Sequence, residues 1–244
     1  NPIDSPVLEM TLHGAEIEFS GDCQIAITGA DMQPLLNGKR VQPYTTVNIK
    51  SKDILHFDRA QRGCRAYMAI RGEWQVKKWL GSCSAVSQMK DHLHIPCAFK
   101  PRESFSVEVY DFIDQRVYPI QKRSVFSSCY VIRVVSGPEF NSLNADMLSN
   151  FFHRIFTISA DSNRMGYRLN EKIQGYAQQE EEISSGIVNG TIQITHSGQP
   201  IILMADAQTT GGYPRLLNII DEDISFAGQM KPGDEVKFML VNPY

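Results

Sequence analysis

Apolar and polar residues alternate along most of the first half of the chain, in short runs separated by turn residues. Alternation with a period of two is typical of strands that have one buried and one exposed face. Each run is bounded by Gly, Pro, Asn or Asp, which favour turns. This half is therefore predicted to be all-β, with strands in the segments 7–12, 15–19, 23–28, 47–49, 53–57, 65–70 and 104–110.

The second half contains one helical pattern among further strand-like runs. Between Ser142 and Phe156 the apolar residues recur at helical spacing, which predicts a single amphipathic helix. Its apolar side chains are expected to face the core rather than a cofactor. Asp221 to Asp223 is interpreted as a turn. Strands are predicted at 130–135, 155–159, 191–195, 200–204, 216–220 and 234–241.

A polar stretch that contains a proline, Val117 to Arg123, separates the two halves. Exposed polar linkers of this kind commonly lie at domain boundaries. Two domains are therefore predicted, residues 1–124 and residues 125–244.

The composition is that of an ordinary globular protein, with 42% hydrophobic and 21% charged residues in 244. The net charge of -3 and the scattered basic residues argue against a nucleic-acid or anionic-membrane surface. No apolar run approaches the roughly 18 residues that a membrane-spanning helix needs. These features predict a cytoplasmic protein with soluble partners, and neither a nucleic-acid nor a membrane partner.

The sequence carries no recognisable metal or nucleotide motif. Its five cysteines are widely spaced without a CxxC pair, so they are predicted to be reduced, mostly buried thiols. His92 and His94 lack a third ligand, and the acidic run 178–182 has no His or Asp at ligand spacing. No metal site is therefore predicted. A GxxxxGK phosphate-binding loop is also absent, which indicates that the chain has no nucleotide-binding fold of its own.

The densest group of functional side chains lies between Asp206 and Arg215. This segment combines a carboxylate, an amide, two hydroxyls, a phenol and a guanidinium around two adjacent glycines, which allow a close backbone approach to a ligand. It predicts a small-molecule or partner site; the alternative is a polar loop that only closes the sheet. Arg164 and Arg168 flank Tyr167 in a second group, which suits anions because guanidinium is a planar fork for carboxylate or phosphate.

Three segments closely resemble one known family: DSNRMGYRL at 161–169, SSGIVNGTIQI at 184–194 and GQPIILMADAQTTGGYPR at 198–215. Shorter matches are LEMTL at 8–12, TGADM at 28–32, RAYMAI at 65–70, GSCS at 81–84 and SGPE at 136–139. The chain resembles the C-type subunit of bacterial ATP-dependent 5-oxoprolinase, whose family is also called allophanate hydrolase subunit 2 or the biotin-dependent carboxyltransferase domain family. That family includes the antagonist of a sporulation-kinase inhibitor. The resemblance implies two cyclophilin-like β-barrel lobes.

The sequence also departs from the pattern of the family. Members usually carry a further N-terminal stretch rich in Gly, Asp and Arg, which implies that the first lobe here lacks its N-terminal part. A proline is usual at His196, a glycine pair is common within residues 71–74, and the span 89–102 is atypical. Most of these departures lie in the first lobe. They therefore affect what the first lobe contributes to a functional site more than what the second lobe contributes.

The resemblance implies three alternative functions. In the first, the chain is part of an ATP-dependent 5-oxoprolinase, which converts 5-oxoproline, ATP and water to glutamate, ADP and phosphate. It would be active only in a complex that uses ATP with Mg, where it and a cyclophilin-like B-type subunit activate the lactam before an A-type subunit hydrolyses it. In the second, it is the carboxyltransferase lobe of a biotin-dependent urea carboxylase or allophanate hydrolase system, with biotin on a separate carrier. In the third, it is a non-catalytic regulator that binds a histidine-kinase inhibitor.

The enzyme hypothesis requires donors that polarise an amide carbonyl and stabilise the negative charge that develops on it. The expected catalytic residues are Arg164, Gln208 and Asp206, the last of which would orient the donors or serve as a base. Tyr213 and Arg215 are expected to bind substrate or phosphate. The full set of expected substrate-binding residues is Thr209, Thr210, Gly211, Gly212, Tyr213, Arg215 and Tyr167.

Overall fold

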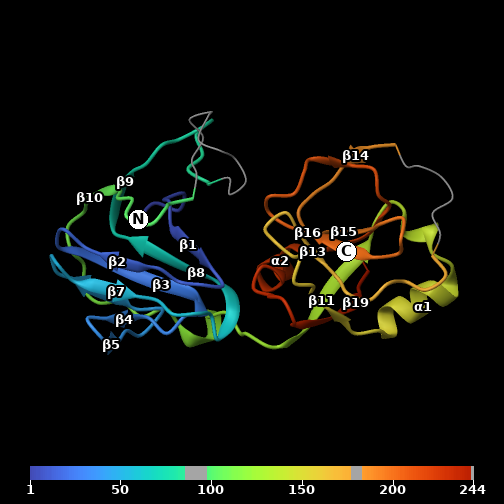
Figure 1. The fold of residues 1–244 in the computed structure, drawn as a ribbon, viewed down its shortest axis with the longest axis horizontal. Coiled ribbons are helices and arrows are strands. Elements are labelled where there is room, and N and C mark those ends of the chain that lie inside the picture. The colour runs from blue at the N-terminus through green and yellow to red at the C-terminus, as the bar shows by residue number, and fades with distance from the viewer. Residues whose placement is uncertain (86–97, 177–182, 243–244) are drawn as a thin grey trace. The chain divides into compact units, whose positions relative to one another are not determined.

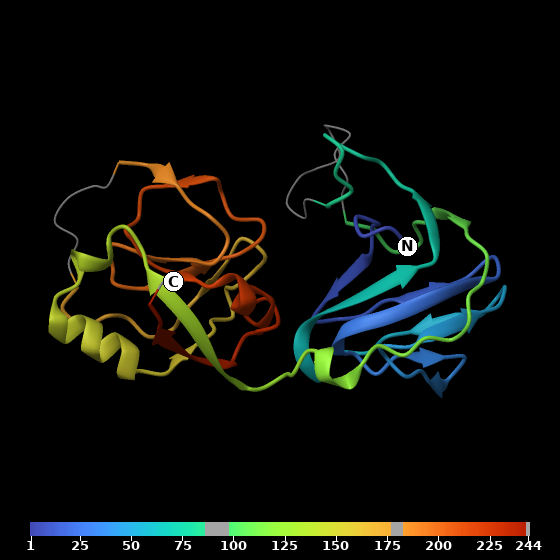
Figure 2. The ribbon, with the colours of Figure 1, turned by 180° about the vertical axis from the view of Figure 1, so that it is seen from behind.

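The structure of the protein is a computed structural model that describes residues 1–85, 98–176 and 183–242. The chain forms two compact units (Figures 1 and 2). Each unit has its own hydrophobic core. The first unit comprises residues 1–61 and 65–124, and the second comprises 62–64 and 125–244. The fold is mostly β, as the alternating pattern predicts, and two α-helices lie in the described residues.

Two four-stranded sheets and one two-stranded ribbon form the first unit, coloured blue to green in Figure 1. The first sheet has the order β1, β8, β3, β6, with bounds Leu8–Thr11, Arg62–Ile70, Cys23–Asp31 and Thr46–Ile49. The second has the order β2, β7, β4, β5, with bounds Glu16–Glu18, Ile54–His56, Leu35–Leu36 and Lys39–Arg40. The ribbon pairs β9 with β10, Gly72–Gln75 and Ser106–Val109.

A buried glutamine in β3 holds an irregular segment of the first unit. Gln24 is 2% exposed. Its Nε2 donates to Asn48 Oδ1 and to the carbonyl of Ile113, both at 2.8 Å, and its Oε1 accepts from the Ile113 amide at 2.9 Å. The backbone around Ile113 belongs to no strand, and the Gln24 side chain therefore satisfies polar groups that a sheet ladder would otherwise satisfy.

A seven-stranded sheet that curls into a half-barrel dominates the second unit. Its order is β12, β19, β11, β18, β15, β16, β13, with bounds Phe156–Thr157, Glu235–Leu240, Cys129–Ser136, Arg215–Ile219, Thr191–Ile194, Pro200–Leu203 and Gly166–Arg168. The pairing of β11 with β19 is parallel. A separate ribbon pairs β14, Ser185–Gly186, with β17, Thr210–Gly211.

The predicted helix forms as α1, Ala145–His153, and packs beside β19 (Figure 2). It begins after Asn144, whose Oδ1 accepts from the amide of Met147 at 2.9 Å and so caps the first turn. Its buried residue Phe151 lies with ring centroids 4.9 Å from Phe156 and 5.3 Å from Phe238. The aromatic face of the helix is therefore part of the core, as predicted.

The turn predicted at Asp221 to Asp223 is wrong, because these residues form the first turn of the helix α2, Asp221–Ala227. Carboxylates are favourable near a helix N-terminus, where the amide dipoles point outwards. Asp223 is 4% exposed and accepts from the guanidinium and the amide of Arg133 in β11, at 2.6 and 2.7 Å. Two short 3-10 turns complete the described elements, η2 at Ile120–Lys122 and η3 at Phe140–Ser142.

Four cysteines lie in the described residues, and each is a free thiol. Cys23 and Cys64 are buried, whereas Cys83 is partly exposed and Cys129 is exposed, so the expectation of mostly buried thiols holds for half of them. Burial raises the pKa of Cys23 to about 11. Cys97 lies outside the described residues.

Candidate functional site

The predicted pair of strands forms the antiparallel hairpin β15–β16, with Ile192 opposite Ile202. All residues of both strands are buried, so the hairpin belongs to the core of the second unit. The bend at 195–199 is closed by the hydroxyl of Thr195, which accepts from the amide of Gln199 at 3.1 Å, and Gly198 takes a φ of +79°. This rigid hairpin carries the loop that contains the candidate residues.

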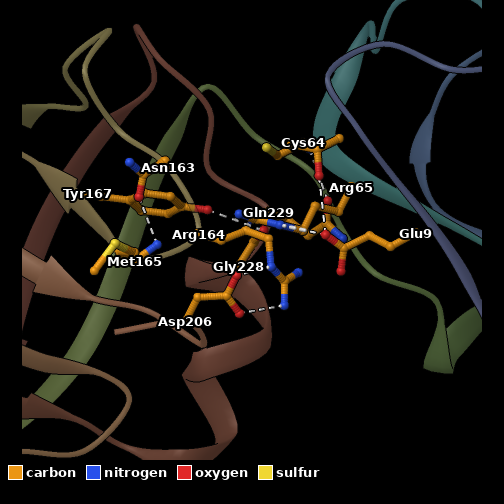
Figure 3. A network of polar contacts seen from close by, with 11 residues as sticks. Glu9, Cys64, Arg65, Asn163, Arg164, Met165, Tyr167, Asp206, Gly228 and Gln229 are labelled. Atoms are coloured by element: carbon orange, nitrogen blue, oxygen red, sulfur yellow. Dashed lines mark hydrogen bonds and ion pairs between the residues drawn. The ribbon is translucent and has the colours of Figure 1, made fainter. Parts of the chain in front are cut away.

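Asp206 and Arg164 face one another where the loop leaves β16 (Figure 3). The guanidinium meets the carboxylate as a two-pronged fork, Nε to Oδ2 at 2.9 Å and Nη2 to Oδ1 at 3.1 Å. The amide of Asp206 also donates to the carbonyl of Arg164 at 2.9 Å. The two segments that the sequence places 42 residues apart therefore meet at this pair.

Gln208, Thr209 and Thr210 follow Asp206, and all three are exposed. The carbonyl of Thr209 accepts from the amide of Ile187 at 3.1 Å, next to the β14–β17 ribbon. The backbone of this segment is thereby fixed, while the amide and hydroxyl side chains remain open to solvent.

Gly211 and Tyr213 lie directly above a buried glutamine of β15. Gln193 is 1% exposed, and its Nε2 donates to the carbonyl of Tyr213 at 3.0 Å. A Cβ at Gly211 would lie 3.0 Å from the same Nε2, so glycine leaves room for the amide. Gly212 is half-buried, and the exposed ring of Tyr213 meets that of His196 edge to face, with centroids 5.3 Å apart.

Arg215 at the end of the loop is paired with Glu139. Its Nε and Nη2 donate to the carboxylate at 2.9 and 2.7 Å, and its Nη1 donates to the carbonyl of Gly186 at 2.9 Å. The amide of Arg215 donates to the same carboxylate at 2.9 Å. These bonds hold the pKa of Glu139 below its ordinary value. The guanidinium groups of Arg215 and Arg164, both of which were expected to bind a ligand, therefore serve intramolecular bonds.

Tyr167 and Arg168 of β13 point to different environments. Tyr167 is 2% exposed and belongs to the core of the second unit, with its hydroxyl 3.5 Å from the carbonyl of Gly228 (Figure 3). Arg168 is exposed. Of the expected substrate-binding residues, Tyr167 is thus the one that the structure places inside the core rather than on the loop.

The site combines two neutralised ion pairs with neutral polar groups. Arg164 faces Asp206, and Arg215 faces Glu139. The groups that remain exposed are the amide of Gln208 and hydroxyls, all of which are uncharged hydrogen-bonding groups. Such a surface suits the uncharged hydrogen-bonding groups of a ligand better than a multiply charged group.

Two residues of the site were not singled out by the sequence pattern, Glu139 and Gln193. Glu139 lies in the SGPE segment, 76 residues before its partner Arg215, and no local pattern links the two. Gln193 alternates with Ile192 and Ile194, a pattern that predicts an exposed polar side chain, so its burial is visible only in the structure.

Among the described residues, no group of three or more His, Cys, Asp or Glu side chains could hold a metal ion. His92, His94 and the acidic run 178–182 lie outside them. Nor does any helix in the part of the chain that the structure describes have the length and apolarity to cross a membrane.

The sequence matches the family model described as carboxyltransferase domain, subdomain A and B, over residues 1–240. It is 32% identical to the C-type subunit of 5-oxoprolinase from Escherichia coli, over 98% of this chain and 76% of that protein. It is 27% identical to urea amidolyase of Saccharomyces cerevisiae, over 98% of this chain but 14% of that protein.

The fold is similar to a solved structure of Kluyveromyces lactis urea carboxylase. The TM-score is 0.84 at 25% sequence identity, over 98% of this chain and 23% of that one. The chain therefore spans about three quarters of the bacterial protein and less than a quarter of the yeast enzyme.

Proposed function

The chain belongs to the family of carboxyltransferase domains with subdomains A and B, and from this premise we propose that it is a subunit of an ATP-dependent 5-oxoprolinase. The observation that carries the proposal is the 32% identity to the C-type subunit of the Escherichia coli enzyme over most of both chains. The proposed complex converts 5-oxoproline, ATP and water to glutamate, ADP and phosphate. It also contains proteins similar to the A-type and B-type subunits.

The loop supplies neutral hydrogen-bonding groups that fit a lactam. 5-Oxoproline has a ring amide with one carbonyl acceptor and one N–H donor, and Gln208, Thr209 and Thr210 carry exposed groups of both kinds. Donors that point at the carbonyl oxygen stabilise the negative charge that develops when the carbonyl is attacked. Gly211 and Gly212 allow the backbone to approach the ring.

Asp206 is the residue of the loop that could act as a base or as an orienting group. The fork from Arg164 fixes both oxygens of its carboxylate, with the two side chains 29% and 22% exposed. A carboxylate held in one orientation at a partly open site can accept a proton from water or direct a neighbouring donor. Arg164 then acts on the substrate through Asp206.

We place ATP and Mg²⁺ in the assembled complex rather than on this loop. Phosphate recognition uses guanidinium or backbone donors that are open to the ligand. Arg215 uses three of its donor atoms for Glu139 and Gly186, and Arg164 uses two for Asp206. The same donor set fits the ring amide of 5-oxoproline, which is uncharged although the molecule also carries one carboxylate.

Reconstitution with candidate A-type and B-type subunits tests the proposal. ADP release is measured with and without 5-oxoproline, with each component omitted in turn. The proposal requires lactam-dependent ADP release that needs this chain. Equal release when the chain is left out would refute it.

The similarity to the urea carboxylase structure favours one second candidate, transfer of a carboxyl group from biotin to a urea-like amide. Biotin would then be attached to a carrier elsewhere, and the same neutral donors would bind its ureido ring. Carboxyl transfer from a biotinylated carrier to urea, measured in parallel, distinguishes the two reactions.

A further inference from the structure

The segment 204–214 connects β16 to β18 and carries most of the candidate residues, and contacts from outside it determine its shape. Along this segment only β17 is a strand, and β17 pairs with the two residues of β14 rather than with the large sheet. A two-stranded ribbon of this length is not stable by itself. Other residues must therefore attach it to the sheet.

Gln193 is the attachment beneath the loop. The pairing of β15 with β18 shifts register between Ile192 and Gln193, so Ile192 lies opposite Leu217 and Gln193 opposite Arg215. A bulge of this kind redirects a side chain. The amide of Gln193 accordingly reaches the carbonyl of Tyr213 at 3.0 Å from inside the core.

Glu139 is the attachment beside the loop. Its carboxylate binds Nε, Nη2 and the backbone amide of Arg215, and thereby aims Nη1 at the carbonyl of Gly186. Gly186 is a residue of β14 and lies opposite Thr210 of β17. The chain of contacts from Glu139 through Arg215 thus ends on the ribbon that carries Thr210.

We propose that Gln193 and Glu139 are positioning residues, which hold the exposed groups of the 206–213 segment in the geometry that the ligand requires without touching the ligand. The expected effect of these residues on turnover rests on the proposed 5-oxoprolinase function, whereas their role in holding the loop does not. Gln193 is 1% exposed and lies under the backbone, and the carboxylate of Glu139 is surrounded by Arg215 donors. Both act from behind the loop.

The backbone amide of Ile187 reports the position of the loop directly, because it donates to the carbonyl of Thr209 at 3.1 Å. Hydrogen exchange at this amide is measured on the full chain for the wild type and for Gln193→Met, which keeps the length of the side chain but removes the amide. We expect exchange at Ile187 to accelerate roughly tenfold, the size of effect that one buried hydrogen bond supports, while the core strand β11 keeps its protection.

Gln24→Met is the matched control, because Gln24 is also a buried strand glutamine whose amide holds an irregular segment. It is expected to lower overall stability without changing exchange at Ile187. If Gln193→Met leaves exchange at Ile187 unchanged, or accelerates it no more than Gln24→Met does, the proposed positioning role is wrong.

Glu139→Gln provides a second variant if Gln193→Met folds poorly. It preserves the side-chain shape but removes the charge and one acceptor oxygen. Asp223→Asn is the matched control, because Asp223 is the carboxylate of another ion pair with an arginine in the second unit. We expect faster exchange at the amide of Ile187 in Glu139→Gln but not in Asp223→Asn. In the reconstituted complex, Glu139→Gln should lower kcat about tenfold with a smaller change in KM, since misplaced donors weaken binding of the transition state most.

The two measurements separate the positioning role from the proposed function. Faster exchange at Ile187 with no lactam-dependent turnover in the wild-type complex would support the positioning role and refute the 5-oxoprolinase assignment. Lactam-dependent turnover in the wild-type complex with unaltered exchange at Ile187 in both variants would support the 5-oxoprolinase assignment and refute the positioning role.

Discussion

Arg215 is the residue whose expected role the structure changes most. The sequence predicts that its guanidinium binds substrate or phosphate, whereas the side chain lies between Glu139 and Gly186 and is 20% exposed. A residue with these contacts stabilises the fold around the 204–214 segment.

Arg215→Ala should therefore destabilise the protein as well as reduce activity. The substitution leaves a partly buried carboxylate without its main donors, which costs roughly 1–3 kcal/mol of unfolding free energy. Urea unfolding monitored by circular dichroism measures the loss. Arg168→Ala, at an exposed arginine with one long bond of 3.4 Å to Gln199, is the control and should change stability little. An unaltered midpoint for Arg215→Ala would contradict the structural role.

The stability that Glu139 contributes should depend on pH. Its folded pKa is below the ordinary value of 4.5 because Arg215 donates to its carboxylate. A carboxyl group with a lowered folded pKa stabilises the fold above the unfolded pKa, and this stabilisation is lost as the pH falls through the folded pKa. The difference in unfolding free energy between wild type and Glu139→Gln should be constant near pH 7 and shrink below about pH 4.5. A difference that grows on acidification would contradict the assignment.

The candidate residues could be predicted from the sequence, but their partners could not. A polar segment around two glycines predicts a functional loop, and the structure places Asp206, Gln208, Thr209 and Thr210 in one segment between β16 and β18. The pairs of Arg164 with Asp206 and of Arg215 with Glu139 join residues 42 and 76 positions apart, and only the fold brings these together.

At the scale of elements, the turn after β11 is fitted tightly against β18. A Cβ at Gly137 would clash with the carbonyl oxygen of Arg215, which belongs to the backbone and cannot move alone. The amide of Gly137 donates to the carbonyl of Leu216 at 2.8 Å. This close approach sets Glu139 beside the guanidinium.

Gly137→Ala should destabilise the second unit by roughly 2 kcal/mol or more, because the added methyl group displaces the backbone of β18. Thermal unfolding measures the change. Gly186→Ala is the control: a Cβ there meets nothing within 4 Å, so it should leave the melting temperature almost unchanged. Similar losses for the two variants would show that the close approach is not the cause.

The N-cap of α1 gives a second test at this scale. Asn144→Ala removes the acceptor for the amide of Met147 and should cost about 1 kcal/mol of unfolding free energy. Asn144→Ser retains an acceptor oxygen and should cost much less. Chemical denaturation of both variants distinguishes loss of the cap from a general effect of substitution at this position.

The elements that were predicted well have a strong periodic pattern of their own. The helix α1 and the strands β15, β16 and β18 were found within a few residues of their bounds. The helix α2 was missed, because its Asp221, Glu222 and Asp223 resemble a polar turn. Its first turn is stabilised by Arg133 of β11, a contact that local sequence does not reveal.

At the scale of the whole molecule, the chain is two β units in a family whose relatives are parts of larger enzymes. It is similar over 98% of its length both to one component of a bacterial 5-oxoprolinase and to a small part of a yeast urea amidolyase. Their shared fold does not by itself determine the substrate. The choice between a lactam and a urea-like amide therefore depends on the reaction measured in the complex.

The most direct test is the release of ADP by candidate A-type and B-type subunits with saturating 5-oxoproline. Three samples are compared: with wild-type chain, without the chain, and with the Asp206→Ala variant. We predict lactam-dependent ADP release with the wild type, none without the chain, and at least a hundredfold loss in the variant, of the order seen when one catalytic group is removed. Undiminished release without the chain, or with a folded Asp206→Ala variant, would contradict the account.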